Sequence, residues 1–164
     1  MNTDADSTDA DLSGPLQRET VASVGYRDLV SLGMDASLAD AVQLMQEKAV
    51  GCVVVVEGES LRGIFTERDL VSRVLGKVDS LQLPLKNYMT PDPVTVRVDE
   101  PVHELLTRMY QGGMRHVPVI DADDRPIGMT SIKRAAHLLA DHYPKAVLNV
   151  APDPERYPKT REGG

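Results

Sequence analysis

Apolar side chains recur at helical spacing in two separate stretches of the chain. The two sets of positions are Leu38, Ala41, Val42 and Met45 in the first stretch and Val102, Leu105, Leu106 and Met109 in the second. Residues spaced in this way lie along one face of a helix, so each stretch predicts an amphipathic helix. We expect Asp35 and Asp99 to cap the N-termini of these helices, because an aspartate accepts hydrogen bonds from the unpaired backbone amides there.

Runs of β-branched residues follow both predicted helices and have the pattern of β-hairpins. The expected strands are residues 29–32, 52–56 and 61–65 in the first half and residues 94–98, 116–120 and 126–130 in the second. Closing helices are expected at residues 66–75 and 131–142. The order strand, helix, strand, strand, helix therefore occurs twice, and the predicted fold class is α/β.

The two halves align with each other as an internal repeat. Shifting the sequence by 64 positions places Asp35 on Asp99 and Val53 on Val117. Two copies are too few for a solenoid, so they predict a pseudo-symmetric pair that shares one interface. We predict a disordered acidic tail at residues 1–14, repeats at residues 15–78 and 79–143, and a Pro-rich tail at residues 144–164.

Charge and composition exclude some classes of function. The chain has 25 acidic and 18 basic residues, a net charge of −7, which argues against binding a nucleic-acid polymer. A local pocket can still be positive and hold a small anion. No apolar run approaches the roughly 20 residues of a membrane-spanning helix, and the N-terminus lacks the pattern of a secretory signal. The single cysteine, Cys52, suits a reducing compartment, so we expect a cytoplasmic protein.

Catalytic and metal-binding patterns find little support in the sequence. His137 and His142 are five positions apart, so they do not share one helix face as a metal-binding pair would. No pattern pairs a nucleophile with a general base, and no P-loop occurs. We therefore expect no enzyme, and any regulation by this chain is expected to act on a separate partner or through its oligomeric state.

Three motifs resemble those of a known family. They are Met89-Thr-Pro-Asp-Pro-Val-Thr-Val96, Arg115-His-Val-Pro-Val-Ile120 and Gly63-Ile-Phe-Thr-Glu-Arg-Asp69. Each repeat resembles a CBS motif, and the tandem pair resembles a Bateman module. This resemblance implies a regulatory protein built of two β-α-β-β-α units packed sheet to sheet and pairing into a homodimer. It also implies an adenosine-containing ligand in a cleft between the repeats.

The start of the first closing helix has two compatible interpretations. Thr66 and Asp69 fit a capping box, in which the hydroxyl and the carboxylate each accept a bond from the other residue's backbone amide. A carboxylate at this position can also accept hydrogen bonds from the two hydroxyls of a ribose. The resemblance favours the second role for Asp69 as well as the first.

The second repeat departs from this pattern. Ser131 keeps the hydroxyl, but Arg134 stands where the first repeat has Asp69, and an arginine accepts no hydrogen bond from a ribose. The resemblance to the gamma subunits of AMP-activated kinases implies phosphate contacts for such a repeat. The basic residues expected to form one cluster facing Asp69 are Arg115, His116, Lys133 and Arg134. The alternative is that they are ordinary surface charges.

The other expected ligand contacts are apolar or come from the backbone. Ile64 is expected to line the adenine or the ribose, and Ser31 to meet the adenine edge. Backbone groups of Cys52, Val53 and Val54 are expected to contact the base. All of these residues also fit simple core packing. The expected ligand is AMP, with ADP or ATP next. The alternatives are S-adenosylmethionine or another adenosyl ligand, and a ligand-free adaptor for an unidentified protein partner.

Overall fold

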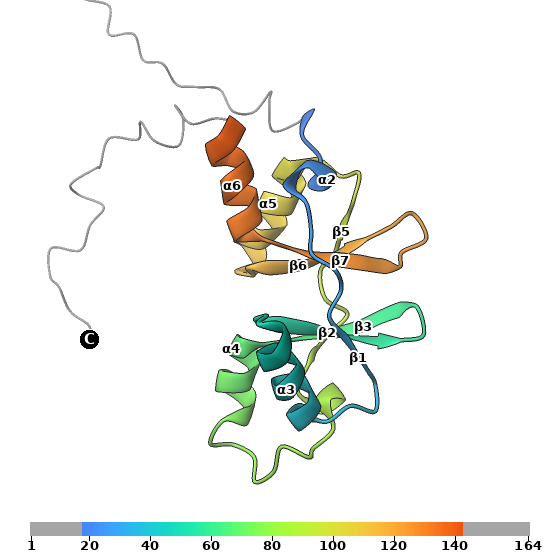
Figure 1. Cartoon of the computed structure of the whole chain (residues 1–164), viewed down its shortest axis with the longest axis vertical. Coiled ribbons are helices and arrows are strands. Elements are labelled where there is room, and N and C mark those ends of the chain that lie inside the picture. The colour runs from blue at the N-terminus through green and yellow to red at the C-terminus, as the bar shows by residue number, and fades with distance from the viewer. Residues whose placement is uncertain (1–17, 143–164) are drawn as a thin grey trace, which may run out of the picture.

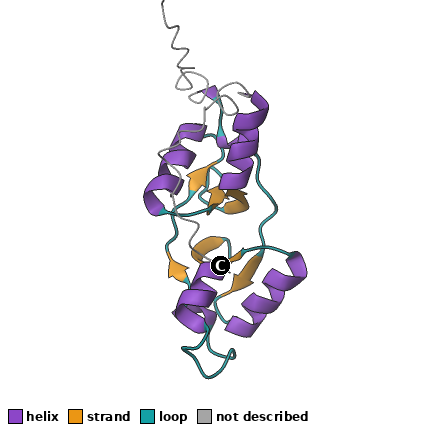
Figure 2. Ribbon diagram, turned by 90° about the vertical axis from the view of Figure 1, so that its left-hand side faces the viewer, coloured by secondary structure: helices purple, strands orange, loops and turns teal. Residues whose placement is uncertain are grey.

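The computed structural model describes residues 18–142, which form two β-sheets with helices on their outer faces (Figure 1). In the view at right angles, strands lie in the middle of the molecule and helices lie towards its two ends (Figure 2). The predicted tails at residues 1–14 and 144–164 lie outside the described residues. The structure is therefore the stacked pair of α/β units that the repeat predicts.

The first half holds a sheet with the order β1-β2-β3-β4. Its strands are β1 (Ser31–Gly33), β2 (Cys52–Glu57), β3 (Ser60–Thr66) and β4 (Thr90–Pro91). Its helices are α3 (Leu38–Lys48), α4 (Glu67–Asp69), which continues into the π-helical turn η1 (Leu70–Val74), and the 3₁₀ turn η2 (Leu85–Asn87). Strand β1 runs parallel to β2, and the other neighbours are antiparallel.

The second half repeats this plan with the sheet order β5-β6-β7. Its strands are β5 (Val96–Arg97), β6 (His116–Ile120) and β7 (Pro126–Ser131), and its helices are α2 (Val21–Val24), α5 (Val102–Gly112) and α6 (Ile132–His142). The hairpin β6–β7 has a register shift between Val119 and Ile120, and β2–β3 has one between Val55 and Val56. These positions correspond under the offset of 64, so the two repeats share even the register shift of their hairpins.

The predicted helix caps are wrong in both halves. Ser37 caps α3: its hydroxyl accepts from the Asp40 backbone amide at 3.2 Å, and Asp40 Oδ2 accepts from the Ser37 amide at 2.8 Å. Ser37 therefore occupies the N-cap position that Asp35 was expected to hold. Its reciprocal pair with Asp40 satisfies two backbone amides at once. Pro101 occupies the cap position of α5, and the Asp99 carboxylate instead lies 3.6 Å from Arg97 Nε.

Alternate side chains of β2 enter two different cores. Val53 and Val55 pack with α3 in the core of the first half, whereas Cys52 and Val54 pack with Ile64 and with Met129 of β7. Because successive side chains of a strand point to opposite faces, the first pair faces the helices and the second faces the other sheet. The two sheets therefore pack face to face.

Each half also takes a segment from outside its own repeat. Val21 and Val24 of α2 are buried in the core of the second half, and Leu85 and Met89, which belong to the second repeat, are buried in the core of the first. The packing therefore crosses the boundary expected between residues 78 and 79. Strand β4 pairs with β3, and Arg27 forms the equivalent bridge to Met129 of β7.

Two equivalent glycines let these exchanged segments approach the sheets. A Cβ atom at Gly63 would overlap the Met89 side chain. A Cβ atom at Gly128 would overlap the Tyr26 ring and lie 2.7 Å from the carbonyl oxygen of Arg27. The long Met89 side chain can move aside, but the backbone of Arg27 is held by its pairing with Met129. A side chain at position 128 is therefore tolerated less well than one at position 63.

We predict that Gly128→Ala lowers the free energy of unfolding by about 1–3 kcal/mol, as overpacking does elsewhere. Gly33→Ala is the matched control, because a Cβ atom at Gly33 has no neighbour within 4 Å. Urea unfolding measures both variants. Equal free energies of unfolding for the two variants would show that Tyr26 and Arg27 do not pack closely against Gly128 of β7.

Candidate functional site

Within residues 18–142, two of the clefts between the halves lie at the starts of the helices α4 and α6. The Asp69 cleft, named after the carboxylate at the start of α4, has a volume of about 420 Å³. The Arg134 cleft, named after the guanidinium at the start of α6, has a volume of about 860 Å³. Gly51, Arg115 and His116 line both clefts and form a shared wall. Both volumes lie in the range of ordinary small-molecule sites.

The Asp69 carboxylate is buried and held by the capping box that the sequence predicts. Asp69 is 7% exposed, and its Oδ2 accepts from the Thr66 amide at 3.0 Å and from the Thr66 hydroxyl at 2.7 Å. The Asp69 amide donates back to the Thr66 hydroxyl at 3.2 Å. Oδ1 lies 3.4 Å from Nε of Arg73. A carboxylate offers about four acceptor positions, so this one can still accept further hydrogen bonds.

Both halves contribute to the Asp69 cleft. Ile64 of β3 lines it from the first half, and Met114 and Pro118 line it from the second. The Arg68 guanidinium donates to the carbonyl oxygen of Gly113 at 3.2 Å, which ties α4 to the end of α5. A molecule in this cleft therefore touches both repeats.

The four expected basic residues do not gather around Asp69. Arg115 and His116 line both clefts, but Lys133 and Arg134 line the Arg134 cleft and not the Asp69 cleft. This arrangement differs from the expected single cluster because the starts of α4 and α6 lie in opposite clefts. The equivalent hydroxyl, Ser131 Oγ, accepts from the Arg134 amide at 3.4 Å. No carboxylate completes that box, since the fourth position is Arg134.

The residues expected to contact a base are spread over several places. Cys52 lines the Arg134 cleft, Val53 and Val54 are fully buried, and Ser31 is exposed and lines neither cleft. Strand β6 faces the Asp69 cleft instead, through His116 and Pro118. The lining residues that sequence reasoning missed include Thr90, Asp92, Pro93, Val94, Met114 and Pro118. The repeat offset was a usable signal for Pro118, because it corresponds to Val54.

Two titratable groups near the shared wall have perturbed pKa values. Burial raises the pKa of the Cys52 thiol to about 11, with a smaller contribution from the Glu67 carboxylate. At neutral pH this thiol stays protonated and is no nucleophile. Burial lowers the pKa of His116, the positive charge of Arg115 lowers it further, and Glu67 opposes both. His116 is therefore neutral at and above neutral pH.

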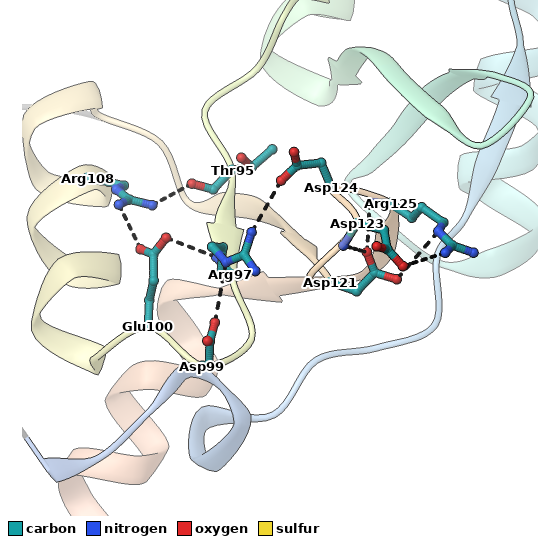
Figure 3. Close-up of polar contacts among 9 residues, drawn as sticks. All are labelled: Thr95, Arg97, Asp99, Glu100, Arg108, Asp121, Asp123, Asp124 and Arg125. Atoms are coloured by element: carbon teal, nitrogen blue, oxygen red, sulfur yellow. Dashed lines mark hydrogen bonds and ion pairs between the residues drawn. The ribbon is translucent and has the colours of Figure 1, made fainter.

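Away from the clefts, cations of the second half are matched to carboxylates (Figure 3). Arg108 lies 2.7 Å from Glu100 and donates to the Thr95 carbonyl oxygen at 2.7 Å. Figure 3 also shows Arg97 between Asp99 and Asp124, and Arg125 beside Asp121 and Asp123. A backbone hydrogen bond from the Arg125 amide lowers the pKa of Asp121. The contacts of Asp121, Asp123 and Asp124 stabilise the turn between β6 and β7.

Other kinds of site were searched for in the described part of the chain. Residues 18–142 contain no group of three His, Cys, Asp or Glu side chains placed to hold a metal ion. No helix in the same range is long and apolar enough to cross a membrane.

The repeated architecture matches a known family. A family model for the CBS domain matches residues 21–76 and again residues 85–142. The chain belongs to the CBS-domain family. The match covers both halves of the structure, so the resemblance seen in the sequence motifs is confirmed, and the protein is a CBS-domain pair.

Relatives of this CBS-domain pair are found in archaea, bacteria and eukaryotes. The chain is 34% identical over 109 residues to an uncharacterized 17.7 kDa protein of Acidianus ambivalens, covering 65% of each chain. It spans only 14% and 26% of the length of two longer curated relatives. A crystal structure of a CBS-domain containing protein from Agrobacterium tumefaciens is 33% identical, with a TM-score of 0.66, covering 73% of this chain and 98% of that one.

A CBS-domain protein of Pyrobaculum aerophilum, solved as a complex with AMP, has the same fold. It is 24% identical with a TM-score of 0.66, and the match covers 71% of this chain and 89% of that one.

We predict that His116 makes the stability of the protein depend on pH. Its folded pKa lies below the ordinary value of 6.5. The unfolded state therefore binds more protons as the pH falls through this range, and the folded state loses stability. The urea midpoint of the wild type should fall more between about pH 8 and about pH 5.5 than that of His116→Gln. Parallel curves for the two proteins would contradict this assignment.

Proposed function

We propose that this CBS-domain pair is a regulatory module that binds an adenosyl ligand in the Asp69 cleft, with AMP preferred over ADP and ATP. The observation that carries the proposal is the Asp69 carboxylate, which lines a cleft of about 420 Å³ and is fixed by the Thr66 capping box. A fixed acceptor loses little conformational entropy when a ligand binds, so it favours binding.

The ribose is the part of the ligand that Asp69 suits. Adjacent hydroxyl groups donate two hydrogen bonds to one carboxylate, and hydrogen bonds to a charged acceptor are stronger than neutral ones. Oδ2 already accepts two bonds from Thr66, so the remaining capacity lies mostly on Oδ1, which also faces Arg73 Nε at 3.4 Å. The adenine ring fits between Ile64 and Pro118, which line the cleft from the two facing sheets.

The positive charge in the Asp69 cleft suits a single phosphate group. Arg68 and Arg73 line this cleft, but both are already engaged, Arg68 with the Gly113 carbonyl oxygen and Arg73 with Asp69 and two carbonyl oxygens. Among the described contacts, Arg115 has no side-chain partner, and it lies on the shared wall. One uncommitted guanidinium matches one phosphate better than three, which is why we favour AMP.

Regulation follows from the position of the cleft between the halves. A ligand that contacts both Asp69 and Arg115 stabilises one relative setting of the two repeats, and a partner or a second copy of the chain responds to that setting. In this proposal the protein is a homodimer, acts on a protein partner and catalyses no reaction itself. A single, buried and protonated cysteine suits the reducing cytoplasm, where we place the protein.

The choice of ligands for a test follows from one related structure and one chemical difference between ligands. The Pyrobaculum protein of the same fold was solved with AMP, so AMP, ADP and ATP come first. S-adenosylmethionine is the comparison ligand, because it has the ribose but no phosphate. A ligand that binds only the folded state raises its stability by about 2.7 kcal/mol at 100 times the dissociation constant.

We predict that AMP raises the melting temperature of the wild type in step with its concentration, and that Asp69→Asn weakens AMP binding by about tenfold or more. The reason is the loss of charged hydrogen bonds to the ribose, each worth about 1.5–3 kcal/mol. Thermal shift and titration calorimetry measure the two effects. Light scattering with and without AMP tests the homodimer.

The matched control is Asp40→Asn. Asp40 forms the same capping box with Ser37 but lies on α3 and lines neither cleft. This variant should lose a cap and keep its affinity for AMP. If S-adenosylmethionine binds more strongly than AMP and Arg115→Gln leaves that affinity unchanged, S-adenosylmethionine replaces AMP as the proposed ligand. No binding of any adenosyl compound would favour the ligand-free adaptor.

A further inference from the structure

The Arg134 cleft is lined by different elements and different chemistry from the Asp69 cleft. Its walls come from the start of α6, the segment that follows α2, and the residues that lead into β2. At about 860 Å³ it is the larger of the two. The proposed adenosyl site does not use this space, apart from the wall that the two clefts share.

Four cations line this cleft: Arg27, Arg115, Lys133 and Arg134. Within residues 18–142, none of their side chains takes part in an ion pair or a hydrogen bond, although Arg27, Arg115 and Arg134 pair through backbone groups. Six of the other seven described arginines do find partners. Carboxylates lie within 4 Å of Arg62, Arg73, Arg97, Arg108 and Arg125, and Arg68 donates to a carbonyl oxygen. The arginines without partners are therefore concentrated around this cavity.

The balance of charge in the Arg134 cleft is positive. Asp28 and Asp141 also line it, so four cations face two carboxylates, a surplus of two positive charges when the histidines are neutral. In the Asp69 cleft three arginines face Glu67, Asp69 and Asp92, which leaves no surplus. On a chain with a net charge of −7, this local surplus is a distinct feature. Like charges around one cavity repel each other, and an anion that enters it relieves that repulsion.

Arg134 also decides which part of a ligand this cleft can hold. It occupies the helical position of Asp69, since its amide donates to Ser131 Oγ as the Asp69 amide donates to Thr66 Oγ1. Its guanidinium lies near Gly25, the residue that ends α2, because Nη1 is 3.4 Å from where a Cβ of Gly25 would stand. A guanidinium donates hydrogen bonds and accepts none, so it suits phosphate oxygens and cannot accept from the ribose hydroxyls as a carboxylate does.

We propose that the Arg134 cleft is a second ligand site, which binds a compound with two or more linked phosphate groups through cations alone, with no ribose contact. Two surplus charges match the linked phosphates of a diphosphate better than a single phosphate ester. Arg27, Arg115 and Lys133 are exposed and Arg134 is half-exposed, so the ligand reaches them directly from solvent. Binding of this kind weakens as salt screens the charges.

Titration calorimetry of the full chain with pyrophosphate and tripolyphosphate tests this proposal. Both should bind, orthophosphate should bind more weakly, and affinity should fall as salt is raised. The double variant Lys133→Gln/Arg134→Gln should lose about tenfold or more in affinity for pyrophosphate, because each lost contact is a charged hydrogen bond. Lys48→Gln/Lys86→Gln is the matched control, since it removes two charges from exposed positions outside both clefts.

The same titrations distinguish this site from the adenosyl site. Asp69→Asn should keep its affinity for pyrophosphate, and an excess of adenosine should not displace pyrophosphate from the wild type. The proposal is overturned if pyrophosphate does not bind, if the control pair loses as much affinity as the Lys133/Arg134 pair, or if Asp69→Asn abolishes the binding. A wild-type chain that binds pyrophosphate but not AMP overturns the adenosyl proposal and supports this one.

Discussion

The burial of the central strands on both faces holds the whole structure together. In β2, Cys52, Val53, Val54 and Val55 are all at most 6% exposed, and β6 is buried from Val117 to Ile120. Val53 and Val55 of β2, like Val117 and Val119 of β6, pack with the helices of their own half, and the other face of β2 meets Met129 of the opposite sheet. Such strands are apolar at every position, with no alternation. Neither half has a solvated sheet face, so the halves stay pressed together.

The clefts lie at the ends of these buried strands. Gly51 comes directly before β2, and His116 begins β6, so polar side chains collect where the apolar contact between the sheets stops. The pseudo-symmetry places the start of a helix in each cleft. One starts with a fixed carboxylate at Asp69, and the other carries a guanidinium at Arg134. This difference between two copies of one repeat contributes to the different chemistry of the two clefts.

Much of the fold can be predicted from the sequence because its signals are local and repeated. The hairpin strands and the long helices lie where the periodicity predicts them, and the hairpin β6–β7 begins at the predicted residue. The caps at Asp35 and Asp99 were wrong because Ser37 with Asp40 forms a better local pair. Helix α2 has four residues and strand β4 has two, too few for any period to reveal them.

The site was harder to predict for a different reason. The capping box of Thr66 and Asp69 is a local motif and was found. The distribution of Lys133, Arg134, Cys52 and Pro118 between two clefts depends on which face of each sheet meets the other. Spacing along one strand does not contain that information. It follows only when the two repeats are placed opposite each other.

The exchange of segments between the halves sets the order in which the chain can complete its structure during synthesis. Val21 and Val24 belong to the core that contains Leu138, more than a hundred positions later. They leave the ribosome early and wait for their core until most of α6 has been made. The core of the first half in turn lacks Leu85 and Met89 until these residues have left the ribosome. Contacts of such long range slow folding, and the growing chain exposes apolar surface for longer than two independent domains would.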